Sequence, residues 1–204
     1  NMITLTSLQK LGIWVDDRSD IDKLCLHLSE VGSLKTLRLC RYSGNPGSQG
    51  GFSKLRHVTE LKLSGELRML PPDLPRNLSR LSLKHTLLKD DPMPILEKLG
   101  QLSFLKMKVA YGGSQLVISR HGFHQLKFLE LNSLYDLDEI KVEEGALPQL
   151  QCLRIRNCRR LWKLPEELKH ISTLDALELV DMPKDFISRL DADMVSSVPN
   201  LRIF

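Results

Sequence analysis

A short hydrophobic pattern, L-x-x-L-x-L, recurs along the chain, with other aliphatic residues replacing some of the leucines. Eight copies begin at Leu8, Leu34, Val58, Leu78, Leu102, Leu126, Leu150 and Leu174, and a ninth begins at Leu201. Their spacings are 26, 24, 20, 24, 24, 24, 24 and 27 residues. Four consecutive spacings of 24 indicate one structural unit used many times, because chance leucine richness would not keep the interval.

Within each unit the last two hydrophobic positions alternate with other residues, which predicts a short strand with one buried face. One such strand cannot bury its face alone, whereas stacked parallel neighbours form a continuous core. We therefore expect an α/β leucine-rich repeat solenoid, curved like a horseshoe, as a single domain over residues 1–204. Its concave side should carry a parallel sheet of about eight strands, and its convex side should be irregular or short-helical.

The segments between the strands predict a varied convex side. Residues 20–31 are expected to form a helix that is capped by Ser19 or Asp20. Its inward stripe consists of Ile21, Leu24, Leu28 and Val31. Residues 94–102 predict a further helical turn with Leu96 and Leu99 inward. Residues 69–72 predict extended backbone, and residues 44–51 predict a mobile loop.

Composition narrows the class of protein. The chain is 42% hydrophobic and 26% charged, which suits a folded core, and no apolar run reaches the ~18 residues of a membrane span. Four scattered cysteines are typical of reduced thiols in a cytosolic protein. A net charge of +4 is too small to indicate a nucleic-acid partner. The chain starts at Asn1 and stops at Phe204, inside the ninth copy, so we expect a fragment of a larger protein.

Catalytic and cofactor motifs are absent from the sequence, including G-x-x-x-x-G-K-[ST], G-x-G-x-x-G and H-E-x-x-H. His121 and His124 lack a third ligand at metal spacing and are expected to be turn residues facing solvent. The pairs at residues 16–17 and 90–91 are interpreted as solvated turn aspartates, the second also as a candidate helix cap. Cys158 is interpreted as a buried structural thiol. We expect neither an enzyme nor a metal or cofactor site.

The concave face concentrates positive charge. Its 24 outward strand positions in the eight complete copies carry nine basic and three acidic residues, a difference of +6. The basic residues are Lys10, Arg38, Lys62, Arg80, Lys84, Lys106, Lys108, Arg154 and Arg156. The acidic residues are Glu60, Glu130 and Glu178. Two interpretations stay open: a solvated polar face, or a docking surface for an acidic patch of a protein partner.

Two aromatic residues, Phe104 and Phe128, occupy equivalent outward positions in adjacent copies. Adjacent strands lie about 4.8 Å apart, so the two rings should be side by side. Exposed apolar rings with a basic rim are typical of an interaction hot spot. That rim consists of Lys106, Lys108, Arg154 and Arg156. The alternative is that the rings only pack on each other and on lysine stems.

Several segments contain sequence motifs that are more specific than the leucine repeat itself. Residues 61–65 read LKLSG with Leu70-Pro71 downstream, and residues 91–99 read DPMPILEKL. Residues 122–129 read GFHQLKFL and are followed by VEEGALPQL at 142–150. Residues 153–158 read LRIRNC and lead to Leu161, Leu164 and Pro165. Together these resemble the C-terminal repeats of plant intracellular nucleotide-binding leucine-rich repeat receptors, most of all the coiled-coil subclass. The resemblance covers residues 55–190 and is weaker over residues 1–50.

The resemblance implies a function. In that family the repeat domain recognises a pathogen effector or a guarded host protein, and it holds the neighbouring nucleotide-binding domain inactive until defence and the hypersensitive response are triggered. ATP or ADP would bind the upstream domain of the full-length protein and not this fragment. The resemblance implies a cytoplasmic protein, with membrane association left open for the full-length form. Its isolated repeat domain is expected to be monomeric, and its full-length form is expected to oligomerise on activation.

Two other classes of repeat protein were weighed. A leucine-rich repeat adaptor, such as a ubiquitin-ligase substrate receptor, would carry an F-box-like helical segment upstream. An extracellular receptor ectodomain would show several glycosylation sequons and paired cap cysteines, and neither feature is present.

Overall fold

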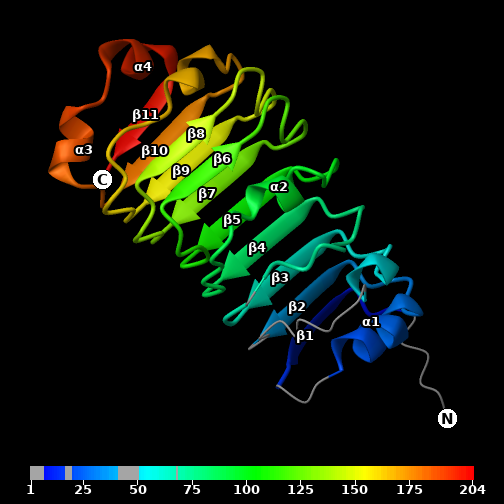
Figure 1. Cartoon of the computed structure of the whole chain (residues 1–204). Coiled ribbons are helices and arrows are strands. Elements are labelled where there is room, and N and C mark those ends of the chain that lie inside the picture. The colour runs from blue at the N-terminus through cyan, green and yellow to red at the C-terminus, as the bar shows by residue number, and fades with distance from the viewer. Residues whose placement is uncertain (1–6, 17–19, 41–50, 68) are drawn as a thin grey trace.

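The main sheet of the computed structural model contains nine parallel strands within the residues it describes, which are 7–16, 20–40, 51–67 and 69–204 (Figure 1). The strands are β1 (Lys10–Trp14), β2 (Thr36–Cys40), β3 (Glu60–Ser64), β4 (Arg80–Lys84), β5 (Phe104–Lys108), β7 (Phe128–Asn132), β9 (Cys152–Arg156), β10 (Ala176–Val180) and β11 (Asn200–Ile203). They follow each other in chain order across the sheet. This is the solenoid that the repeated pattern predicted.

The inward leucines form continuous rows because adjacent strands are in register. Leu105 lies opposite Leu129, Leu129 opposite Leu153, and Leu153 opposite Leu177. All four side chains are buried, with Leu129 only 2% exposed. The predicted burial of the central leucines is therefore confirmed.

The start of the ninth copy was predicted wrongly. Leu201 of β11 lies opposite Leu177, so it occupies the second hydrophobic position and not the first. The first position is held by Val198, which is buried. The ninth copy therefore begins 24 residues after Leu174, which extends the run of equal spacings and adds a ninth strand to the eight expected.

Short helices connect strands near both ends of the main sheet and near its middle. They are α1 (Ile21–Ser29), α2 (Met93–Leu96), α3 (Lys184–Ser188) and α4 (Ala192–Ser197), with 3-10 turns η1 (Phe52–Lys54) and η2 (Glu166–His170). Asp20 caps α1 by accepting a hydrogen bond from the backbone N–H of Lys23 at 3.0 Å. Ile21, Cys25 and Leu28 are the buried residues of α1, so a cysteine joins the predicted stripe, while Leu24 and Val31 are only partly buried.

The second predicted helical turn is shorter than residues 94–102. Helix α2 ends at Leu96, after which tighter i→i+3 hydrogen bonds continue the turn, as from the N–H of Leu99 to the oxygen of Leu96. Leu96 and Leu99 are buried as expected. Described residues between β3 and β4 form neither helix nor strand, so no helix stands where residues 69–72 were predicted to be extended. The loop predicted over residues 44–51 lies, apart from Gly51, outside the described residues, as does Ser19.

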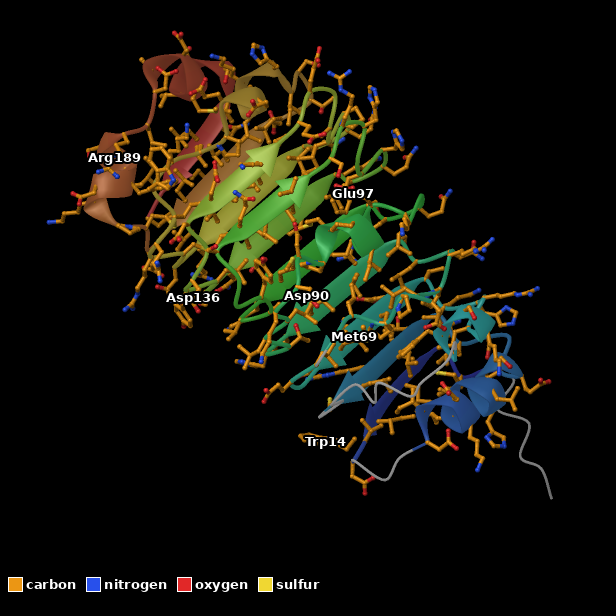
Figure 2. The ribbon with its side chains drawn as sticks, in the orientation of Figure 1. Trp14, Met69, Asp90, Glu97, Asp136 and Arg189 are labelled. Atoms are coloured by element: carbon orange, nitrogen blue, oxygen red, sulfur yellow. The ribbon has the colours of Figure 1, made fainter. Side chains whose placement is uncertain are left out.

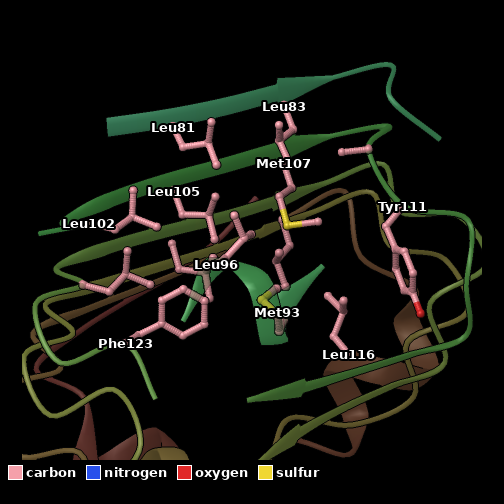
Figure 3. Packing of buried hydrophobic residues seen from close by; sticks show 14 of the residues in the cluster. Leu81, Leu83, Met93, Leu96, Leu102, Leu105, Met107, Tyr111, Leu116 and Phe123 are labelled. Atoms are coloured by element: carbon pink, nitrogen blue, oxygen red, sulfur yellow. The ribbon is translucent and has the colours of Figure 1, made fainter. Parts of the chain in front are cut away.

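A second sheet on the convex side was not expected. Strands β6 (Gln115–Ile118) and β8 (Glu139–Val142) pair in parallel, and this sheet lies across one face of the main sheet (Figure 1). Figure 3 shows Leu116 of β6 across the core from Met107 of β5. Leu116, Ile118, Ile140 and Val142 are the buried residues of the two strands. The convex side is therefore part sheet, and not only irregular or helical.

The residue after most main-sheet strands turns the chain through the left-handed region. Its φ lies between 49° and 54° at His85, Val109, Ser133, Asn157 and Asp181. The next residue then points into the turn, as the sequence predicted. Thr86, Ala110, Leu134 and Cys158 are buried at this position, and Met182 is half-buried.

Candidate partner-binding surface

The outward side chains of the main sheet form three rows, because every pair of neighbouring strands shares one register. The first row runs Lys10, Thr36, Glu60, Arg80, Phe104, Phe128, Cys152, Ala176 and Asn200. The second runs Gly12, Arg38, Lys62, Ser82, Lys106, Glu130, Arg154, Glu178 and Arg202. The third runs Trp14, Cys40, Ser64, Lys84, Lys108, Asn132, Arg156 and Val180. All the predicted site residues lie in these rows, which we call the concave face; Trp14 stands at its N-terminal end (Figure 2).

Glu130 lies near the centre of the second row and forms ion pairs with two of the cations predicted to bind a partner. Its carboxylate lies 2.9 Å from the Lys106 ammonium and 3.7 Å from the Arg154 guanidinium. The Asn132 amide also donates a hydrogen bond to it at 3.3 Å. Glu130 is only 2% exposed, whereas its basic partners are partly exposed. The carboxylate therefore acts as an anchor beneath the surface.

Glu178 pairs with two cations in the same way, two strands further on. Arg154 donates a short charged hydrogen bond to it, and Arg202 lies 3.8 Å away. The hydrogen bond from Arg154 lowers the pKa of Glu178, and the same bond raises the pKa of Arg154. Arg202 was missed because the ninth copy had been read out of register.

Glu60 pairs with one cation on each of the third and fourth strands. It lies 3.0 Å from Lys62 and 3.9 Å from Arg80, and it accepts a hydrogen bond from the Thr36 hydroxyl at 3.0 Å. Burial alone would raise the pKa of Glu60, but the hydrogen bonds from Lys62 and Thr36 and the nearby positive charges outweigh it and lower the pKa.

The charge that remains unneutralised lies mainly on the N-terminal half of the concave face. Within the described chain, Lys10, Arg38, Lys84 and Lys108 form no ion pair. Arg156 reaches Asp181 only at 4.0 Å. The difference of +6 counted from the sequence is thus distributed unevenly, with free cations concentrated on strands β1 to β5.

Phe104 and Phe128 lie side by side, as predicted. Their ring centroids are 4.5 Å apart and their planes differ by 3°. The Arg80 guanidinium lies 3.9 Å from the Phe104 centroid, and the Arg154 guanidinium lies 5.7 Å from that of Phe128. Both rings are half-buried, so the packing alternative is present in part, with arginine rather than lysine as the neighbour. Their role in binding a partner stays a prediction.

A recess opens beside this stack. Its volume is about 310 Å³, and its walls come from Glu60, Lys62 and Arg80 on one side and from Phe104 and Lys106 on the other. One edge of a ring and several charged groups therefore line the same hollow, which is the mixed chemistry of a protein-binding pocket.

Cys25, Cys158, His121 and His124 lie outside the concave face. Burial raises the pKa of Cys158 to about 11 and that of Cys25 to about 12, so neither is a reactive thiolate. The four cysteines, all among described residues, form no disulfide. His121 and His124 are exposed turn residues, as expected. No group of three His, Cys, Asp or Glu side chains suited to a metal occurs within the described ranges.

Asp91 was interpreted too simply as a solvated turn residue. One carboxylate oxygen accepts the N–H of Met93, at the start of α2, at 2.9 Å. The other accepts the N–H of Val117, in β6, at 2.9 Å. Asp91 is half-buried and joins two repeats. The predicted capping role is therefore confirmed, whereas the predicted full solvation is wrong.

The sequence has no glycine-rich phosphate loop. Among the helices that the structure describes, each is too short or too polar to cross a bilayer.

The comparisons with known proteins agree with this architecture. Residues 1–185 match the family described as leucine-rich repeat region, and the chain belongs to that family. It is also similar in fold to the leucine-rich repeat domain of the type III effector XCV3220 (XopL), with a TM-score of 0.66 over 95% of this chain and 75% of that chain. Their sequences are 18% identical, so this likeness concerns the fold alone.

Sequence similarity points to a more particular group. The chain is 31% identical over 197 residues to the disease resistance protein RPP8 of Arabidopsis thaliana, covering 93% of this chain and 22% of RPP8. It is 35% identical over 195 residues to the probable disease resistance protein At1g59620 of the same plant, covering 91% and 22%. It is 35% identical over 188 residues to the disease susceptibility protein LOV1 of Arabidopsis, covering 89% and 20%. The chain spans about a fifth of the length of these curated relatives.

Proposed function

We propose that this chain is the protein-recognition and autoinhibition segment of a plant immune receptor, which acts in the cytoplasm. It detects a pathogen effector or a guarded host protein and restrains the receptor until that event triggers defence. The similarity to plant disease resistance proteins supports the class of protein. Nucleotide binding is assigned to another domain of the full-length receptor, and oligomerisation to its activated form.

The observation that carries the proposal is the uneven charge of the concave face. Arg38, Lys84 and Lys108 lie on three of the first five strands without an acidic partner in the described chain. Exposed cations gathered on one face attract an acidic surface and speed its association. We assign this half of the face to the acidic surface of the receptor's own nucleotide-binding domain, which would hold the receptor inactive.

The stack and its recess supply a second, chemically different region. Phe104 and Phe128 present aromatic surface at the centre of the sheet, next to the recess beside Arg80. Partly buried aromatic and arginine groups with a charged rim are enriched among residues that dominate binding energy. We assign this region to the effector or guarded protein.

The autoinhibition arm is tested by charge reversal in the full-length receptor. Arg38→Glu, Lys84→Glu and Lys108→Glu together should cause cell death in leaves without a pathogen, and should weaken co-precipitation with the separately expressed nucleotide-binding domain. The matched control reverses Lys89, Lys98 and Lys184, which are exposed lysines outside the strands. Lys62 and Arg80 are avoided because both already pair with Glu60.

Salt dependence provides the physical check. Attraction between exposed charges is screened over about 8 Å at physiological ionic strength, so co-precipitation should weaken as salt rises. A concave-face triple variant that stays silent in leaves and still binds the nucleotide-binding domain like the control triple would refute the autoinhibition assignment.

The recognition arm is tested separately. Phe104→Ala with Phe128→Ala should abolish the pathogen-dependent response while the chain stays folded, although the melting temperature falls because about 1 kcal/mol of stacking and the burial of two half-buried rings are lost. If the double variant accumulates to a normal protein level and keeps the pathogen-dependent response, the two rings serve only in packing and the recognition assignment is wrong.

A further inference from the structure

The two strands of the convex sheet differ in how their outer edges are completed. On β6, the outward N–H of Val117 donates to Asp91 at 2.9 Å, and the N–H of Ser119 donates to Glu97 at 2.7 Å. Glu97 lies just after α2 (Figure 2). Carboxylates of the preceding repeat therefore close the outer edge of β6.

Among the described residues, none covers the outer edge of β8 in this way. Glu143, which follows β8, donates its N–H towards β6, to the oxygen of Ile118 at 2.9 Å. Successive residues of a strand direct their backbone groups to opposite edges, so those of Ile140 and Val142 point away from β6. Within the described residues β8 pairs only with β6, which leaves this second edge without a strand partner.

The next repeat does not supply a third strand. Residues 163–166 stand 24 positions after Glu139–Val142 and would extend the sheet if the pattern continued. One long hydrogen bond begins that pairing, from the N–H of Trp162 to the oxygen of Asp138 at 3.4 Å. Pro165 has no N–H to donate, and the chain then enters η2. The open edge is therefore built into the sequence.

A groove runs along this edge. Between residues 139–144 and residues 163–167 lies a hollow of about 620 Å³. A second hollow of about 650 Å³ shares Val142, Glu143, Glu144 and Glu167 with it and extends to residues 170–172. Each is above the ~300 Å³ at which ligand sites begin, and the first follows the whole length of β8.

The groove is acidic, in contrast to the concave face. The first hollow is lined by five glutamates and three basic residues, a net charge of −2. The glutamates are Glu139, Glu143, Glu144, Glu166 and Glu167. Arg120, one of the three cations, is held by Glu144 at 2.6 Å. An occupant of positive charge would match this lining.

We propose that the free edge of β8 binds an extended basic segment of another protein, which adds to the convex sheet as a third strand. Backbone hydrogen bonds with Ile140 and Val142 hold the segment, and lysine or arginine at alternate positions meets the glutamates. Strand β8 is about 13 Å long, which accommodates four to six residues of the partner. This inference does not depend on the function assigned to the concave face.

The test uses the 204-residue chain and the fluorescein-labelled peptide Lys-Val-Lys-Val-Lys-Val, with binding followed by fluorescence anisotropy. The peptide Glu-Val-Glu-Val-Glu-Val should bind about tenfold more weakly or not at all. Two further versions carry backbone N-methyl groups, one on the lysines and one on the valines. Only one of these versions should lose binding, because a strand directs alternate N–H groups to one edge. Hydrogen exchange at Ile140 and Val142 should slow when the lysine peptide is bound.

Charge reversal locates the site. Glu166→Lys with Glu167→Lys should weaken the lysine peptide about tenfold, whereas Glu30→Lys with Glu66→Lys, at exposed positions outside the groove, should leave binding unchanged. The proposal is overturned if the acidic peptide binds equally well, if both N-methylated peptides bind like the parent, or if protection appears on the main sheet instead. Dimerisation of the chain through β8 in the absence of any peptide, measured by sedimentation, would also overturn it.

Discussion

Val109 and Asn157 occupy equivalent positions two repeats apart, and both adopt the left-handed conformation, with φ of 50° and 49°. Asparagine tolerates this region, whereas a β-branched residue is strained there by about 1–2 kcal/mol. The backbone N–H of Val109 still donates to Asn132 at 2.9 Å, so the sheet holds the strained residue in place. The solenoid thus imposes one turn geometry on residues of very different preference.

Val109→Asn should therefore raise the free energy of unfolding by about 1 kcal/mol, because it relieves the strain without changing the turn. Asn157→Val should lower it by at least as much, since it also removes hydrogen bonds with Ser133 and Arg159. Urea denaturation measures both. Val180→Asn is the control, because Val180 is also half-buried but does not have a positive φ. Equal effects at residues 109 and 180 would rule out strain as the cause.

Leu129→Ala should destabilise the chain by about 2–5 kcal/mol, because it opens a cavity at a fully packed position in the middle of the sheet. Leu129 lies between Leu105 and Leu153 in neighbouring strands. Leu87→Ala, at an exposed leucine, should change stability by less than about 0.5 kcal/mol. The free energies come from urea unfolding followed by circular dichroism, and a small loss at residue 129 would contradict the packing described.

Glu130→Gln should cost about 1–3 kcal/mol, because it leaves Lys106 and Arg154 without the buried charge that pairs them. The effect should exceed that of Glu66→Gln, which alters an exposed side chain. If the two substitutions prove equally mild at neutral pH, Glu130 is not the anchor of the second row.

The lowered pKa of Glu178 predicts how stability responds to acid. Its pKa in the folded chain is below the ordinary value of 4.5, chiefly because Arg154 donates a hydrogen bond to the carboxylate. The resulting stability is complete above the unfolded pKa and is lost as pH falls through the folded pKa. Wild type should therefore be more stable than Glu178→Gln at pH 7, and the difference should vanish in strong acid. Glu30→Gln serves as the exposed control, and a difference that persists in acid would exclude this origin.

The main sheet could be predicted from the sequence because its signal is local and repeated. Leucines at period two within each copy give the inward face, and equal spacing gives the register that places Phe104 beside Phe128. The ninth copy was misplaced because Leu201 was taken for its first hydrophobic position, which Val198 occupies as Val58 does in the third copy. A valine is buried at this position as well as a leucine, so the 24-residue spacing predicts the start of the ninth copy better than the residue type does.

The convex sheet and the charge balance depend on contacts between repeats, which explains why they were missed. Strands β6 and β8 have only four residues each, and neither run predicts a strand until the other lies beside it. The pairing of Glu130 with Lys106 and Arg154 follows from the row that these residues share. The equal spacing of the copies already predicts this register. A comparison of charges along each row, in place of their sum, would therefore predict the pairing of Glu130 with Lys106 and Arg154.

The stack of Phe104 and Phe128 is tested by a double-mutant cycle. Parallel rings with centroids 4.5 Å apart should be coupled by about 0.5–1.5 kcal/mol beyond their separate burial. Phe104→Ala, Phe128→Ala and the double variant are compared by urea unfolding. Phe104→Ala combined with Cys152→Ala provides the control, because Cys152 is two strands away and the effects should add within about 0.5 kcal/mol. Coupling no larger than in this control would mean that the contact between the two rings adds no stability beyond their separate burial.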